Sequence, residues 1–178
     1  VLMEPVNGVE DRKIILYLNE NGKSEILEDI DIVKDLLSRG YSICAVDLRG
    51  IGETSPDLTS KFWDFLAGKP IFGQRVKDVL SIVHWVKGPQ VGAQDIKVWG
   101  TGMCALYSAF AGVLNNEITQ FVLEEPLISF ESVVQVDEPA FRDEVILPGI
   151  LEKFDMGQVY QALCPRAVSM INPLSGDK

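Results

Sequence analysis

Short apolar segments alternate with longer segments of helical periodicity along most of the chain. Five segments are short, apolar and rich in β-branched residues, as buried strands are: 13–18, 41–47, 96–99, 118–123 and 167–171. Four others repeat apolar residues every three or four positions, which predicts helices: 24–39, 74–87, the segment after Gly102, and 151–163. Strands that alternate with helices and are buried on both faces form a parallel sheet. The sequence therefore predicts an α/β fold with a parallel five-stranded sheet flanked by helices.

Composition and charge limit which partners and which cellular compartment are expected. The 178 residues carry 26 acidic and 16 basic side chains, a net charge of −10, which argues against nucleic acid as a partner. No apolar run reaches the ~20 residues that span a bilayer, so no membrane association is expected. The first residues lack the pattern of a secretory leader, and three cysteines are too few for a disulfide scaffold. We expect a single domain over residues 1–178, whole or partial, and a cytoplasmic location is favoured.

The turn between the third strand and the following helix admits two interpretations. Gly100, Gly102 and Ala105 fit the G-x-G-x-x-A pattern that lets a dinucleotide pyrophosphate approach a helix N-terminus. Glu124, about 20 residues further on, stands where such a site needs an acid for the ribose. The same turn also has the placement of a nucleophile elbow, G-x-S-x-G, in which glycines allow a strained backbone to expose the central side chain. On that alignment the nucleophile position is Gly102, and Cys104 replaces the closing glycine.

Several segments, taken in order, resemble those of α/β-hydrolases, in particular acetyl-xylan-esterase-like carbohydrate esterases. Residues 47–54 read D-L-R-G-I-G-E-T and resemble the D-x-R-G-x-G-x-S/T loop of that superfamily. Residues 68–80, 95–100, 124–130 and 164–173 are similar to further segments of these esterases, so that the resemblance covers about nine-tenths of the chain. It implies that the five strands are the third to seventh of the family's sheet. Their spatial order would then be second, first, third, fourth, fifth.

The resemblance also assigns roles at the carboxyl ends of the strands. Acyl transfer needs a nucleophile, a histidine base, an acid and an oxyanion hole of backbone N–H groups. By resemblance, the N–H donors are those of Met103, after the nucleophile position, and of Glu20 or Asn21 in the loop after the first strand. Asp177 lies near the place of the family's acid, where a solvated terminal aspartate is the simpler interpretation. Asn19 and Glu20 replace a usual His-Gly pair.

Other side chains are further candidates for catalysis or binding. Residues 102–104, Gly-Met-Cys, resemble the G-x-C elbow of dienelactone-hydrolase-like members of the superfamily, which makes Cys104 a weak candidate nucleophile. A helix N-terminus could lower the pKa of its thiol, but a packed core residue is the simpler interpretation. Glu125 could hold a water in the ligand cleft, and Arg49 could bind a carboxylate or a substrate anion, although an ion pair that fixes its loop is the simpler role. His84, the only histidine, lies mid-helix on the polar face, where we expect it to be exposed. Three aromatic residues have the position of a cap or of a docked helical turn: Phe62, Trp63 and Phe65.

Together these features predict a degenerate esterase-like domain that is not catalytic as written. We expect no metal site and no cofactor, because no spacing of Cys, His and acids resembles a zinc site. The expected ligand is a small molecule or a carbohydrate ester, and the expected partner is a second copy or a neighbouring hydrolase domain. Two alternatives stay open: a working hydrolase that uses Cys104 or residues outside this chain, and a dinucleotide-binding module for NAD or NADP. If the chain is complete, its shortened sheet has an unpaired edge, which we expect a dimer to cover.

Overall fold

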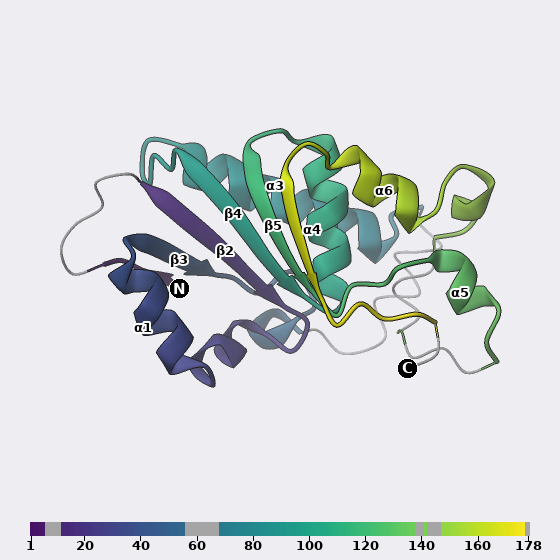
Figure 1. Ribbon diagram of the computed structural model, residues 1–178, viewed down its shortest axis with the longest axis horizontal. Helices are drawn as coiled ribbons and strands as arrows, with labels where there is room; N and C mark the ends of the chain where they lie inside the picture. The colour runs from purple at the N-terminus through teal and green to yellow at the C-terminus, as the bar shows by residue number, and fades with distance from the viewer. Residues whose placement is uncertain (6–11, 56–67, 138–140, 142–146, 177–178) are drawn as a thin grey trace.

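A computed structural model describes residues 1–5, 12–55, 68–137, 141 and 147–176 (Figure 1). The expected cap residues 62–65 and Asp177 lie outside these ranges. The strands form one sheet in the order β1-β3-β2-β4-β5-β6. Their bounds are β1 Leu2–Met3, β2 Lys13–Asn19, β3 Tyr41–Ala45, β4 Asp95–Thr101, β5 Ile118–Glu124 and β6 Ala167–Ile171.

Five of these strands are parallel and stand in the spatial order that was expected, so the predicted α/β class and strand order are confirmed. The count of five was wrong by one. Strand β1 adds an antiparallel pairing with β3, in which Leu2 lies opposite Cys44 and Met3 opposite Ile43. A two-residue strand has too little periodicity to be found from sequence.

Helices connect the strands, and two of them differ from the sequence prediction. Helix α3 (Ile71–Lys87) and helix α4 (Met103–Leu114) occupy the expected segments. The segment 24–39 is a 3-10 turn, η1 (Lys23–Leu27), followed by α1 (Ile30–Ser38). The segment 151–163 is likewise divided between η4 (Ile150–Glu152) and α6 (Met156–Ala162), because Asp155 caps α6 by accepting a hydrogen bond from the Met156 N–H. Two further short helices, η2 (Gly52–Thr54) and α5 (Phe130–Val134), were not expected.

The helices cover the two faces of the sheet unequally. Helices α3 and α4 lie behind the sheet in Figure 1 and pack on alternate residues such as Leu16, Val98 and Phe121, which form the larger core. On the opposite face, α1 covers only β2 and β3, through a smaller cluster that contains Val33 and Ile43. In front of β4, β5 and β6 the same view shows no helix among the described residues.

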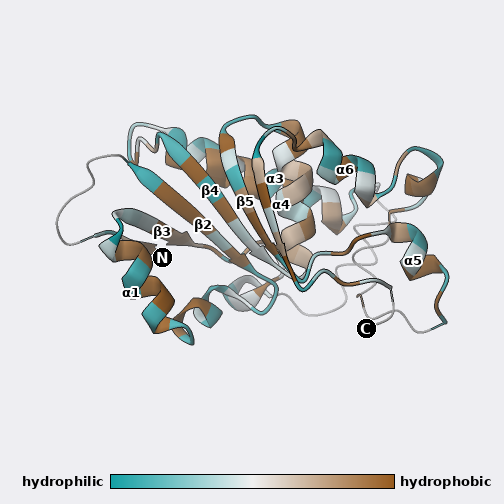
Figure 2. Ribbon diagram, in the orientation of Figure 1, coloured by the Kyte–Doolittle hydropathy of each residue, from teal (hydrophilic) through white to brown (hydrophobic). Residues whose placement is uncertain are grey.

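The burial pattern of the strands follows from these layers. Strand β2 is buried at almost every position, as expected for a strand covered on both faces. Strand β4 alternates between fully and partly buried residues, so its burial on both faces was wrongly predicted. Figure 2 shows the apolar stretches of the strands and the largely apolar helix α4 meeting at the centre of the molecule. No helix of the described ranges is long and apolar enough to cross a membrane.

Candidate functional site

A sharp turn joins β4 to α4 at the carboxyl end of the central strand. Gly102 has φ 60° and ψ −127°, a conformation that strains any residue with a Cβ. Its N–H donates to the Glu124 carbonyl at 2.9 Å, and α4 begins with the next residue. At Gly100, a Cβ would lie 2.8 Å from the Cys104 carbonyl oxygen and 2.9 Å from the Ala105 Cα. The two glycines therefore allow a close strand-to-helix crossing and a strained central residue, which is the geometry of a nucleophile elbow.

The Glu20 side chain occupies the position where a nucleophile would stand. A Cβ built on Gly102 would lie 2.3 Å from the Glu20 carboxyl carbon, well inside van der Waals contact. The Met103 N–H, the first amide of α4, donates a hydrogen bond to Glu20 Oε2 at 2.9 Å. A carboxylate at a helix N-terminus is favoured by the helix dipole as well as by this bond. The chain thus supplies its own anion to the elbow.

This arrangement gives Glu20 and Asn21 roles that differ from the expected ones. Glu20 was expected to offer its N–H to an oxyanion, whereas its carboxylate accepts the Met103 N–H. The Asn21 N–H donates to the Asn19 side-chain oxygen at 2.8 Å, and Asn19 Nδ2 in turn donates to the Tyr17 hydroxyl at 2.9 Å. The Asn21 amide is therefore committed to its own turn. Of the expected binding residues, the structure brings together Glu20, Gly102 and Met103.

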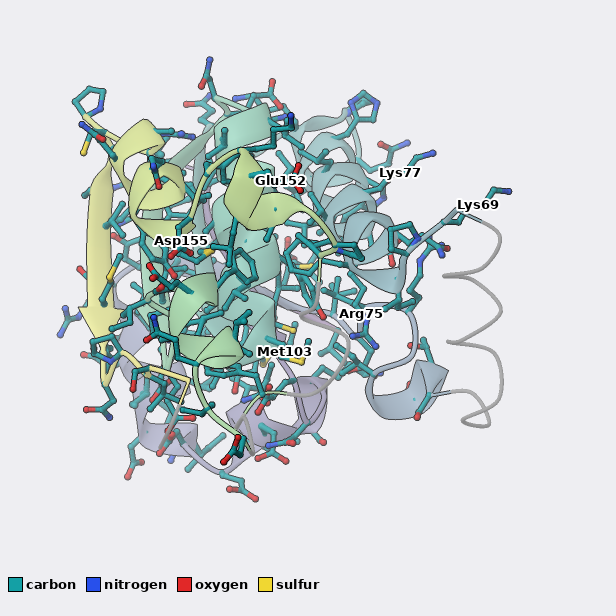
Figure 3. The ribbon with its side chains drawn as sticks, turned by 90° about the vertical axis from the view of Figure 1, so that its right-hand side faces the viewer. Lys69, Arg75, Lys77, Met103, Glu152 and Asp155 are labelled. Atoms are coloured by element: carbon teal, nitrogen blue, oxygen red, sulfur yellow. The ribbon has the colours of Figure 1, made fainter. Side chains whose placement is uncertain are left out.

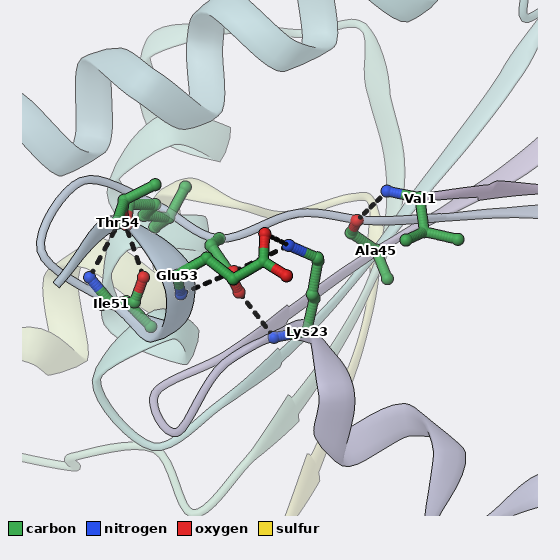
Figure 4. Close-up of polar contacts among 8 residues, drawn as sticks. Val1, Lys23, Ala45, Ile51, Glu53 and Thr54 are labelled. Carbon is green, nitrogen blue, oxygen red and sulfur yellow. Dashed lines mark hydrogen bonds and ion pairs between the residues drawn. The ribbon is translucent and has the colours of Figure 1, made fainter.

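The loop that carries Glu20 is linked to the loop after β3 by a cluster of charged residues, Lys23, Asp47 and Glu53 (Figure 4). Asp47 accepts hydrogen bonds from the Lys23 N–H at 2.6 Å, the Lys23 ammonium at 3.0 Å and the Glu53 N–H at 3.1 Å. Partial burial alone would raise the pKa of the Asp47 carboxyl, but these hydrogen bonds together hold it below its usual value. Gly52 is required there, because a Cβ would lie 2.7 Å from the Asp47 carboxylate.

A pocket of about 520 Å³ lies beside this cluster. Lys23 and Asp47 provide polar groups on its wall, and the remaining wall is largely apolar, with Met3, Ile26 and Leu27 among its residues. The pocket and the elbow are both reached from the carboxyl ends of the parallel strands, the edge where such sheets bind ligands.

Arg49 and Glu125 do not join the elbow. The Arg49 guanidinium forms an ion pair with Asp78 on α3, and one of its nitrogens donates to Gln74 Oε1. Glu125 is exposed, has φ 50°, and its N–H donates to the Ile171 carbonyl at 2.8 Å. Arg49 thus fixes its loop against α3, and the Glu125 backbone links β5 to β6.

Glu124 lies on the other side of the turn, where the dinucleotide alternative needs a ribose-binding acid. Its Oε2 accepts hydrogen bonds from Trp99 Nε1 at 3.2 Å and from Thr101 Oγ1 at 3.3 Å. Trp99 also packs edge-on against Tyr17, with ring centroids 5.2 Å apart. The Glu124 carboxylate is therefore held by its own sheet.

The thiol of Cys104 is enclosed in the protein core. The residue is 1% exposed, and burial raises the pKa of its thiol to about 12, although the positive charge of Arg75 partly offsets this. Arg75 is itself buried, with Nη1 2.9 Å from the Tyr107 hydroxyl and Nε 2.9 Å from the Arg49 carbonyl. Figure 3 shows Met103 at the start of α4 with Arg75 on the neighbouring helix. This environment opposes formation of a Cys104 thiolate.

No histidine lies at the elbow. His84, the only one in the sequence, is exposed in the last turn of α3, as predicted. Since α3 leads into the start of β4, its last turn lies at the amino end of that strand, opposite the elbow. No group of His, Cys, Asp and Glu side chains in the described ranges could hold a metal ion.

Comparisons with known proteins identify the fold. No protein-family model matches the sequence, and no curated protein matches it. A solved candidate acetyl xylan esterase from Bacteroides fragilis superposes on 95% of this chain with a TM-score of 0.80 and 18% identity. A ferulic-acid-bound esterase from Butyrivibrio proteoclasticus (TM-score 0.59, 17% identity) superposes on 93% of the chain, and an esterase from Pyrococcus furiosus (0.58, 16%) on 98%.

The superposed part is a different share of each of these proteins. This chain spans 54% of the Bacteroides protein, 66% of the Butyrivibrio protein and 83% of the Pyrococcus protein. At these identities the likeness concerns the fold, which is the one that the sequence segments around the elbow had indicated. The chain therefore has the α/β-hydrolase fold, the fold of these superposed esterases.

Proposed function

We propose that this chain is a non-hydrolytic esterase-like domain whose elbow is closed by its own Glu20 carboxylate. One observation carries the proposal: the Met103 N–H, which would stabilise an oxyanion, is bonded to Glu20 Oε2, and Gly102 offers no nucleophile. An oxyanion hole acts by donating to charge that develops in the transition state. The Met103 N–H is already paired with a carboxylate, so it would have to lose a charge-assisted hydrogen bond before it could donate to an oxyanion.

The ligand that we expect for this chain is inferred from two of the superposed proteins. The Bacteroides protein is a candidate acetyl xylan esterase, and the Butyrivibrio esterase was solved with ferulic acid bound. We infer that a small-molecule ligand of this chain is a carbohydrate ester, bound at the carboxyl ends of the strands without turnover. The pocket of about 520 Å³ beside Lys23 and Asp47 is the place we assign to it.

Stopped-flow hydrolysis of p-nitrophenyl acetate tests the absence of catalysis. We expect no burst and no turnover above buffer, for this chain and for Cys104→Ala alike. Glu20→Ala is included to open the elbow, with Glu28→Ala, an exposed glutamate, as the matched control. We expect both variants to stay inactive, because opening the donor supplies neither nucleophile nor base.

The possible outcomes separate the alternatives. A burst that is lost in Cys104→Ala would identify an acylated cysteine and replace this proposal by a thiol hydrolase. Turnover that survives Cys104→Ala would require another nucleophile and would equally refute it. Ligand binding is tested separately by calorimetry with acetylated xylo-oligosaccharides, where heat of binding without release of acetate is expected. If none of these oligosaccharides gives heat of binding, the assignment of a carbohydrate ester as the ligand is refuted.

A further inference from the structure

A second pocket lies at the amino ends of the parallel strands, at the opposite end of the sheet from the elbow (Figure 1). Its walls come from residues between β1 and the start of β4, including Ile14 on β2 and Ala93 before β4, which belong to the larger core. Its volume is about 220 Å³, below the range of about 300–1,000 Å³ that is usual for drug-sized ligands. The pocket therefore suits a small molecule, and its apolar wall suits a short aliphatic group.

The hydroxyl of Ser42 reaches this pocket without a hydrogen-bond partner. Ser42 lies on β3 and is 5% exposed, and no described residue forms a hydrogen bond with its hydroxyl. In the described ranges, every side-chain nitrogen or oxygen that is fully buried has a partner, so the unpartnered Ser42 hydroxyl must face open space. A polar group in such a place costs free energy unless water or a ligand bonds to it. Ser42 therefore gives the pocket a polar group that a ligand can bind.

The Arg12 side chain lines the same pocket. Arg12 has φ 43°, in the left-handed region that residues with a Cβ rarely adopt, and its carbonyl accepts the Gln94 N–H at 3.0 Å. Its guanidinium lies against Gly92, where a Cβ would overlap it. None of the acidic side chains that the structure describes forms an ion pair with it. An unpaired guanidinium is thus held beside the pocket, and a guanidinium is the cation best suited to bind a carboxylate.

A negative charge lies on the wall as well. Glu4 follows β1 and lines the pocket, and its carboxylate has no partner among the described residues. Lys13, the first residue of β2, also lines the pocket and already has an interaction partner. Glu4 and Arg12 therefore face one small pocket with opposite charges and form no ion pair with each other. A ligand that carries both a carboxylate and an ammonium group pairs with both of them.

We propose that this pocket binds a small α-amino acid in its zwitterionic form. The ligand carboxylate pairs with the Arg12 guanidinium and accepts the Ser42 hydroxyl, the ligand ammonium pairs with Glu4, and a short aliphatic side chain lies against Ile14. A simple anion fits less well, because Glu4 and the net charge of −10 both repel it, whereas a zwitterion has no net charge. This site lies apart from the elbow and does not depend on the function proposed there.

An NMR titration of the isotope-labelled 178-residue chain with glycine, L-alanine and L-valine, each up to about 20 mM, tests the proposal. We expect saturable shifts of the Arg12, Ser42 and Ala93 amides with a millimolar dissociation constant, which is typical of a ligand with few atoms. The Glu20 and Met103 amides at the elbow should not shift. Isovalerate is L-valine without its ammonium group, and isobutylamine is L-valine without its carboxylate. Each should bind at least about tenfold more weakly than L-valine, because it leaves one charge of the pocket unpaired.

Two variants remove one charge each from the pocket. Arg12→Gln and Glu4→Gln should each raise the dissociation constant for L-valine about tenfold and stay folded by circular dichroism, since both residues are exposed. Arg39→Gln and Glu28→Gln, at exposed positions away from the pocket, are the matched controls and should leave the constant unchanged. No shift with any of the three amino acids would overturn the proposal, and so would isovalerate that binds as tightly as L-valine. Binding that is unchanged in both Arg12→Gln and Glu4→Gln would also overturn it, because the ligand would then lie elsewhere.

Discussion

Replacing Gly102 by serine, the residue of a working elbow, is expected to destabilise this chain by a coupled mechanism. The backbone conformation at φ 60° costs any residue other than glycine about 1–2 kcal/mol. The new Cβ would also lie 2.3 Å from the Glu20 carboxyl carbon, so the carboxylate must leave. Losing the bond from the Met103 N–H costs about 1.5–2 kcal/mol, the low end for charged acceptors because Glu20 is half-buried. The sum is about 3 kcal/mol.

A double-mutant cycle isolates the part that comes from Glu20. In Glu20→Ala the hydrogen bond is already lost, so Gly102→Ser should cost only its backbone strain, about 1–2 kcal/mol. The free energy of unfolding of the four proteins, measured in urea, should give a coupling of about 1.5–2 kcal/mol. In the matched cycle with Glu28→Ala, the two effects should add. Additivity of Gly102→Ser with Glu20→Ala would refute the placement of the carboxylate at the elbow.

Three further predictions concern the turn, the thiols and the loops. Gly100→Ala should destabilise the protein by about 1–3 kcal/mol, because its Cβ would meet the backbone of α4. Gly73→Ala in α3 is the control: its Cβ meets nothing within 4 Å, so the change should be neutral or stabilising by up to about 1 kcal/mol. The free energies of unfolding of the two variants, measured in urea, provide the comparison. A thiol reagent should modify the exposed Cys164 quickly in the native protein and the two buried cysteines only after denaturation. Rapid modification of Cys104 in the native protein would contradict its burial. Because hydrogen bonds depress the pKa of Asp47 in the folded protein, its contribution to stability should be complete above the unfolded-state pKa near 3.8 and lost as pH falls through the lower folded-state pKa. The stability of Asp47→Asn should therefore depend less steeply on pH below pH 4 than that of the unchanged protein, as measured by acid unfolding. The same pH dependence in both proteins would be inconsistent with this pairing.

The strand order and the elbow could be predicted because they depend on local patterns. The run after Asp47 and the glycines at 100 and 102 each constrain a short segment, and the order of such segments indicated the fold. Strand β1 escaped prediction because two residues show no periodicity. The break in the segment 24–39 was missed for a related reason, since η1 and α1 share one apolar face and only the geometry near Asp29 separates them.

The closure of the elbow could not be predicted from the sequence. Glu20 and Met103 are 83 residues apart, and the contact depends on where a flexible side chain turns after its strand ends. The sequence did place both residues at the same edge of the sheet, because parallel strands share their carboxyl ends. It could not indicate that the Glu20 carboxylate, rather than its amide, would face the helix. The link of Lys23 to Asp47 was missed likewise, although the polar run after each strand marked both loops.

Hydrogen exchange of the Met103 amide is the measurement that tests the central claim most directly. That N–H is the first of α4 and donates to Glu20 Oε2, so it should exchange slowly in the folded protein. In Glu20→Ala it should exchange much faster, while amides in the middle of α4 should keep their protection. Equal exchange of the Met103 amide in both proteins would show that Glu20 does not close the elbow, and the account of a self-blocked esterase fold would fail.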